Sequence, residues 1–234
     1  MHKQRHLARM LACLLVLLLV YAGNNAAKTL EVGLVAYSDR QAMRRDFNQT
    51  VKLSEGNWQV ILEKLHRAVT LQPDNPDLLH QLGRAWMQSH RYESDSDGAA
   101  IAARRNAVDY FRRAIIQRPS WPHDRMDYLL ARYRLGDIDD SFYQQLLAAN
   151  LLGPWEAWVQ QVTAEIGLQL GDRLPLELHE ILDASIVNGV QHPDGTKAML
   201  EVLRRYNSLD RVCGKVNYEL VIQFCRRYFA ASRS

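Results

Sequence analysis

The residues of this sequence that could most readily take part in catalysis are paired carboxylates and single histidines. Glu177 and Glu180 are one helical turn apart, which can pair carboxylates for acid–base catalysis but is more typical of a solvated helix face. His192 can titrate near neutral pH, yet Pro193-Asp194-Gly195 after it predicts a turn with Asp194 as the N-cap of the next helix. The sequence contains no glycine-rich phosphate loop, nucleophile elbow or zinc-type histidine pair. It therefore predicts no enzyme, no metal site and no cofactor.

The elements that carry these residues follow a repeated spacing, in which an Ala is followed five positions later by a Pro. The spacing occurs at Ala68 to Pro73, Ala114 to Pro119 and Ala149 to Pro154, with 46 and 35 residues between successive prolines. The tetratricopeptide repeat (TPR) has a period of about 34 residues, so the longer interval implies an insertion of 12, covering the acidic segment 93–98. Counted from Pro76, eight positions match the repeat: Leu79, Leu82, Gly83, Trp86, Ala107, Phe111, Ala114 and Pro119.

Helical periodicity continues to the end of the chain, and no alternating strand pattern occurs. We therefore predict an all-α fold: a TPR-like solenoid of helical hairpins with about 2.5 repeats, an N-terminal membrane helix and a C-terminal helical cap. The expected divisions are 1–27 for the signal or anchor, 28–57 for a linker helix, 58–171 for the repeats and 172–234 for the cap. A first repeat helix at 34–51 is a much weaker match. Arg125 and Arg132 occupy positions in the third repeat that usually carry large apolar residues.

Stacked repeats turn the first helix of each hairpin toward a concave groove, where a partner binds. The residues predicted to face it are Asp77, His80, Gln81, Arg84 and Gln88, followed in the next repeat by His123, Asp127 and Arg134. Arg84 and Arg134 could hold a carboxylate or a sugar acid, and a partner helix fits equally well. The two histidines are expected at the surface. Trp121 and Trp155 are expected to pack between repeats rather than against sugar rings.

The N-terminus is predicted to engage a membrane, because three basic residues precede the uncharged run 10–22. We favour a retained single-pass anchor in a bacterial inner membrane with the bulk in the periplasm, over a signal peptide cleaved after Ala22. Beyond Arg9 the chain has 26 basic and 26 acidic residues, which argues against nucleic-acid binding. In an oxidising compartment Cys213 and Cys225 are either a disulfide or two buried thiols.

The segments Arg118-Pro119-Ser120-Trp121-Pro122, Leu135-Gly136-Asp137 and Leu152-Gly153-Pro154-Trp155-Glu156, with Phe142, resemble the VpsP-type proteins of bacterial exopolysaccharide clusters. The tail segments Leu203-Arg204-Arg205-Tyr206 and Leu209-Asp210-Arg211-Val212-Cys213 are similar too, while His123 and Arg125 depart from the pattern. The resemblance implies a role in polysaccharide biosynthesis or export without a defined catalytic step. We expect protein partners such as glycosyltransferases or export components, and the chain could also self-associate. A general periplasmic adaptor and a glycan hydrolase are the alternatives.

Overall fold

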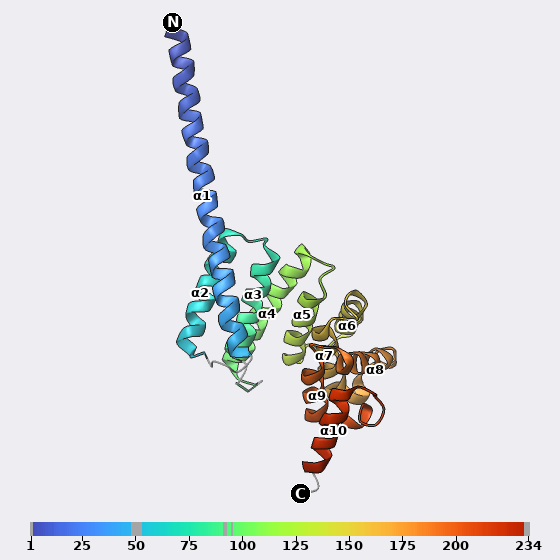
Figure 1. Cartoon of the computed structure of the whole chain (residues 1–234). Coiled ribbons are helices and arrows are strands. Elements are labelled where there is room, and N and C mark those ends of the chain that lie inside the picture. Colours follow the sequence, from blue (N-terminus) through green and yellow to red (C-terminus); the bar gives the residue numbers. More distant parts are fainter. Residues whose placement is uncertain (1, 48–52, 91–92, 95, 232–234) are drawn as a thin grey trace.

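The computed structural model describes residues 2–47, 53–90, 93–94 and 96–231 (Figure 1), and the regular structure of these residues is entirely helical, which confirms the all-α prediction. The helices are α1 (His2–Phe47), α2 (Glu55–Leu71), α3 (Pro76–Ser89), α4 (Gly98–Gln117), α5 (Pro122–Arg134), α6 (Asp140–Leu152), α7 (Ala157–Leu170), α8 (Leu176–Gln191), α9 (Thr196–Arg205) and α10 (Glu219–Ala231). Short 3-10 turns at Gly171–Arg173 and Leu209–Arg211 follow α7 and α9.

Helix α1 is continuous, and its N-terminal half projects away from the rest of the chain (Figure 1). Its segment Cys13–Met43 is long and apolar enough to cross a membrane, by length and composition. The predicted division at residue 27 is not a structural break, because Ala26 and Ala27 favour helix and no proline interrupts α1. Val32 and Met43 are buried against α2 and α3, so the predicted linker helix is part of the folded core. Helix α2 also begins inside the predicted linker, at Glu55, because the Ser54 side chain accepts from the Asn57 N–H and caps it.

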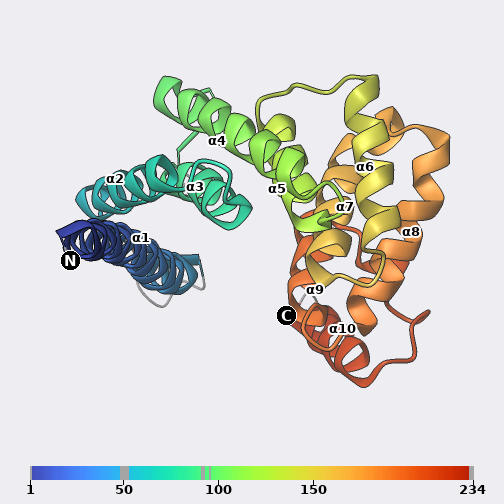
Figure 2. The same cartoon turned by 90° about the horizontal axis from the view of Figure 1, so that it is seen from above.

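The helices pair into successive antiparallel hairpins: the C-terminal part of α1 with α2, α3 with α4, α5 with α6, and α7 with α8 (Figure 2). Each helix contacts the next one along the chain, and the first helices of successive hairpins also contact one another. The start of α3 shows how the sequence sets this geometry. Pro76 occupies the first turn, and the Asn75 side chain accepts from the N–H groups of Asp77 and Leu78. One face of the molecule is therefore built from α1, α3, α5 and α7.

The hydrophobic core is divided near the middle of the chain rather than at the predicted boundary of residue 172. One cluster joins α1, α2 and α3, with Ala114 of α4. A larger cluster runs from Met126 in α5 to Cys225 in α10 without interruption. The reason is the close packing of α7 on α8, where a Cβ at Gly167 would lie 2.9 Å from a Leu182 methyl carbon. The predicted C-terminal cap is thus continuous with the hairpins before it.

Arg132, at a position that usually carries an apolar residue, is 4% exposed and remains charged through local ion pairs. Its guanidinium contacts Asp137 at 2.7 Å and Asp139 at 3.1 Å, both in the turn between α5 and α6. Hydrogen bonds from the Ser141 hydroxyl, the Phe142 N–H and Arg132 lower the pKa of Asp139 to about 2. The buried arginine therefore fixes the turn of the hairpin in which arginine replaces the usual apolar residue of the repeat.

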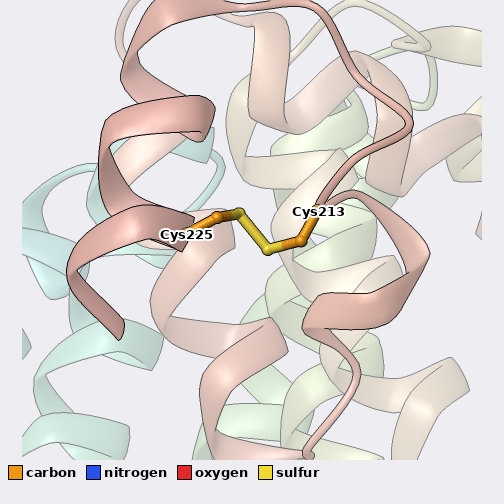
Figure 3. Close-up of a disulfide and its surroundings, with 2 residues drawn as sticks. All are labelled: Cys213 and Cys225. Carbon is orange, nitrogen blue, oxygen red and sulfur yellow. A yellow bond between two sulfur atoms is a disulfide. The ribbon is translucent and has the colours of Figure 1, made fainter. Parts of the chain in front are cut away.

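Cys213 and Cys225, for which the sequence left two states open, form a disulfide (Figure 3) with Cα atoms 5.8 Å apart. The bond ties the segment after α9 to α10, which also contacts α9. Cys13, in the apolar part of α1, is the remaining cysteine and is exposed. The disulfide is therefore one attachment of the last helix, beside its packing on α9 and on the core.

Replacing Cys213 and Cys225 together with serine is expected to release α10. The bond spans a sequence separation of 12 residues, and a crosslink that closes a loop of this size stabilises by about 2–3 kcal/mol, mainly by restricting the unfolded chain. Hydrogen exchange of the full chain in detergent micelles should show lost amide protection in α10. Dithiothreitol should reproduce the loss in the wild type and leave the double-serine variant unchanged. Retained protection in that variant would contradict the assignment.

Candidate partner-binding groove

A hollow of about 530 Å³ opens on the face built from the first helices of the hairpins. Three elements contribute to it: the end of α1, one side of α3, and the turn between α4 and α5 with the first residues of α5. Its lining residues are Arg40, Met43, Asp77, His80, Gln81, Arg84, Gln88, Arg118, Trp121 and His123. Cationic and amide side chains predominate in this set, so the hollow is suited to a polar partner that accepts hydrogen bonds.

Six of the eight residues predicted from the repeat positions line this hollow: Asp77, His80, Gln81, Arg84, Gln88 and His123. Asp127 is only 5% exposed, and it lies beneath the surface as a partner of other side chains. Arg134 is directed to α7, where its guanidinium lies 3.4 Å from Glu165. The repeat register thus identifies α3 well and loses accuracy on α5, because α5 is covered by α7.

His80, expected at the surface, has a side chain that is only 14% exposed and lies between two aspartates of α5. Its Nδ1 is 2.6 Å from an Asp124 oxygen, at ion-pair distance but without the direction of a hydrogen bond. Its Nε2 is 3.2 Å from Asp127, and its ring also packs on Phe111 at 5.6 Å between centroids. This cluster joins α3 to α5, so we correct the expectation of a surface histidine.

Asp124 is fully buried and is held by Arg118 through two hydrogen bonds, of 2.6 Å from Nε and 2.9 Å from Nη2. Burial alone would raise the pKa of Asp124, but His80 and Arg118 together outweigh it and hold the pKa below its usual range. Arg118 also reaches Asp77 at 2.7 Å, so one guanidinium links the starts of α3 and α5. Neither Asp124 nor Arg118 was predicted, because their roles depend on the contact between hairpins.

Arg40 and Met43 were also missed, because the sequence assigns them to a linker helix. Both lie on the part of α1 that packs across α3, and Met43 is 5% exposed. With the side-chain amide of Gln81 oriented to satisfy its neighbours, its nitrogen donates to the Ala36 carbonyl and its oxygen accepts from Arg40. The end of α1 therefore forms one wall of the hollow. Its weak match to the repeat pattern was the one sequence signal of this role.

The polar face continues beyond the hollow onto α7 and α9. The indole N–H of Trp158 donates to Asp127 at 2.8 Å, and the guanidinium of Arg84 lies 5.9 Å from the Trp158 ring centroid. Glu165 of α7 accepts from Arg134 and lies 3.7 Å from Arg205 of α9. Arginines from α3, α5 and α9 thus line this face, with carboxylates placed between them.

Trp121 and Trp155, predicted to pack between repeats, are 48% and 67% exposed. They belong to the turns that precede α5 and α7, where neighbouring prolines hold the chain close to the next hairpin. A Cβ at Gly153 would lie 2.8 Å from a Pro122 ring carbon, and His123 lies 3.2 Å from Glu156. Because Pro122 and Gly153 fill the contact between the turns, the indoles remain outside it.

The remaining sequence candidates do not form a site. Glu177 and Glu180 are exposed on α8, on the outside of the molecule. Asp194 is not the N-cap of α9, because that helix begins at Thr196 after Gly195, and the Asp194 N–H donates instead to the His192 ring. Within the described part of the chain, no group of three or more His, Cys, Asp and Glu side chains is arranged to hold a metal ion.

No family model and no curated protein sequence matches this chain. The proposals that follow therefore rest on the residues, the groove and the resemblance stated from the sequence.

Proposed function

We propose that this protein is a membrane-anchored TPR-like adaptor that binds protein partners on its concave face and serves bacterial exopolysaccharide biosynthesis and export. The proposed binding of partners is supported by the hollow formed by α1, α3 and the start of α5, which is lined by arginine, histidine and amide side chains. A helical-repeat face of this kind binds an extended segment or a helix without performing chemistry on it.

The chemistry of the lining favours a partner that carries carboxylates. Arg40, Arg84 and Arg118 lie around one hollow, together with the imidazole rings of His80 and His123. Arginine guanidinium groups hold carboxylates through paired, charge-assisted hydrogen bonds. An acidic segment or a chain terminus of a partner can therefore displace the weaker of the internal pairs, such as the 3.9 Å contact of Arg84 with Asp127.

The location and the pathway have separate support. The apolar length of α1 supports a single-pass anchor, and the basic residues before it favour a cytoplasmic N-terminus with the hairpins in the periplasm. The disulfide is compatible with that oxidising compartment. The polysaccharide part rests on the resemblance of the segments 118–122, 135–137 and 152–156 to VpsP-type proteins.

Photo-crosslinking in living cells tests both parts of this proposal. We expect p-benzoyl-phenylalanine in place of Arg84, which lines the hollow, to capture a glycosyltransferase or a polysaccharide export protein. The matched control places the same residue at Arg105, which is exposed on α4 and outside the hollow. The control should give no such product.

Equal capture at both positions would contradict the groove as the binding face. Specific capture of unrelated envelope proteins at Arg84 would contradict the polysaccharide part and favour the general periplasmic adaptor. An Arg40→Glu exchange beside the crosslinker should reduce capture of a partner rich in carboxylates.

A further inference from the structure

Helix α1 carries three exposed apolar side chains where it runs beside the hairpins. Leu30, Leu34 and Tyr37 are 64%, 62% and 69% exposed, and they are four and three residues apart. Val32 and Met43, which are packed against α2 and α3, are each 5% exposed. Because an α-helix turns by about 100° per residue, the three exposed side chains lie on the side of α1 that faces away from the hairpins. Figure 2 shows α2 and α3 on one side of α1, and the other side at the edge of the molecule.

The spacing of these side chains continues back through the uncharged segment 10–27. Alternating steps of three and four residues connect eight positions, here named the α1 seam: Cys13, Val16, Val20, Gly23, Ala27, Leu30, Leu34 and Tyr37. None of the eight is charged, and they extend over about three and a half heptads, which is typical of helices that pair as a coiled coil. Leu11, Leu14 and Leu18 lie on the opposite side of the helix, where they can face lipid. Small residues such as Gly23 let two helix backbones approach closely within a membrane.

Lipid can cover only part of the α1 seam. Leu30, Leu34 and Tyr37 follow Lys28, the first charged residue after Arg9, so they lie outside the hydrocarbon layer that residues 10–27 are long enough to span. In a coiled coil, apolar side chains at this spacing are covered by a second helix with the same heptad spacing. A second copy of this chain supplies such a helix. Two copies that cross one membrane in the same direction have parallel α1 helices, and each seam residue then meets its counterpart.

The charges beside the α1 seam and the position of the hairpins both permit this pairing. In a parallel pair, the position that faces Glu31 is Ala26, so no like charges meet between positions 13 and 37. The Glu31 carboxylate also has a partner within its own chain, because it lies 2.7 Å from Arg67 of α2. Since α2 and α3 pack on the other side of α1, the hairpins of two copies lie on opposite sides of the paired helices. A second copy is therefore the occupant that the α1 seam fits.

We propose that this protein forms a parallel homodimer in which two α1 helices pair along the α1 seam, through the membrane and for about 15 Å beyond it. This inference rests on the proposed anchoring through α1 and does not depend on what the groove binds. None of the residues that line the hollow belongs to the seam, so pairing leaves both grooves accessible. The dimer presents two grooves to one partner assembly, which strengthens binding to a partner with repeated sites.

Disulfide trapping on the full chain tests the pairing, because Cys13 belongs to the α1 seam and lies outside the Cys213–Cys225 disulfide. The protein is diluted into a large excess of phosphatidylcholine vesicles, oxidised with copper phenanthroline and separated on a non-reducing gel. We expect the wild type to form a covalent dimer, and Cys13→Ser/Val20→Cys, at a second seam position, to form it as well. The matched control Cys13→Ser/Leu18→Cys places the thiol on the opposite side of α1. It should give about tenfold less dimer, because its Cα atoms cannot reach the separation of a disulfide.

The exchange Leu34→Glu tests the part of the α1 seam outside the membrane. Two carboxylates would face each other in the dimer, so trapping through Cys13 should fall by about tenfold or more. The matched control is Leu176→Glu, because Leu176 is 82% exposed at the start of α8 and belongs to no part of the seam. This control should leave trapping unchanged. Both leucines are exposed in the single chain, so neither exchange should disturb the fold, which circular dichroism checks.

Resistance of the protein to a carbonate wash separates the dimer from the anchor. Protein that stays in the vesicles but is trapped equally through Cys13 and through Leu18→Cys, or is not trapped at all, overturns the dimer and leaves the anchor intact. Trapping that Leu34→Glu leaves unchanged overturns the pairing beyond the membrane. Covalent products with a different membrane protein in cells, without the dimer, overturn a second copy as the occupant. Protein removed by the wash overturns the anchor and the dimer together.

Discussion

Replacing Gly83 with alanine is expected to lower the free energy of unfolding by about 1–3 kcal/mol, the usual cost of overfilling a packed core. The added Cβ would lie 2.6 Å from the Phe111 ring, and Phe111 is fully buried between α3 and α4. The ring has little room to move, because Ala107 and Ala131 are buried in the same cluster. Thermal unfolding of the full chain in detergent, followed by circular dichroism, measures the loss.

The control for this substitution is Gly56→Ala, because a Cβ at Gly56, near the start of α2, meets nothing within 4 Å. Alanine favours helix over glycine by up to about 1 kcal/mol, so this change should leave stability unchanged or raise it. The same chemical change should therefore have opposite signs at the two sites. Combining Gly83→Ala with Phe111→Leu should cost less than the sum of the single changes. Additive costs would show that the clash with the Phe111 ring is not the cause of the lost stability.

Replacing Asp124 with asparagine is expected to lower the free energy of unfolding at neutral pH by about 3 kcal/mol. This is the usual cost of removing one partner of a buried ion pair. The carboxylate is fully buried, and its loss leaves Arg118 and His80 without their main anionic partner. The contact between the second and third hairpins should weaken first. Denaturant unfolding at pH 7 measures the loss, and hydrogen exchange should locate it at the starts of α3 and α5.

The loss of stability caused by Asp124→Asn should become smaller as the pH falls. The folded pKa of Asp124 is lowered from its ordinary value of 3.8, so its stabilisation is complete above that value and is lost as the pH falls through the folded pKa. The difference in stability between the variant and the wild type should therefore narrow as the pH falls below 3.8. The control is Asp109→Asn, an exposed pair with Arg112 whose loss should cost less than about 0.5 kcal/mol at any pH. A difference that persists unchanged at low pH would contradict the carboxylate's role.

The sequence predicted helices from their periodic spacing, whereas the one N-cap that it predicted, Asp194, does not cap α9. Pro76, the first position of the predicted repeat, is the first residue of α3, and the structure adds that Gly83 and Phe111, which both match the repeat, lie against each other. The groove residues of α3 followed from the same register. On α5 the register failed for Asp127 and Arg134, because α7 covers that helix through Trp158 and Glu165. Nothing local in the sequence of α5 indicates which helix will pack on it.

The sequence by itself determined the all-helical class and the apolar N-terminal segment, because periodicity and hydropathy act over a few residues. Only the tertiary structure decided that α1 forms a wall of the hollow, that the core runs past residue 172, and that Asp124 and Asp127 lie against His80. Those outcomes depend on residues about 40 positions apart meeting across hairpins, as Arg118 meets Asp77. The exposure of Trp121 and Trp155 was decided in the same way, because Pro122 and Gly153 fill the contact between the two turns.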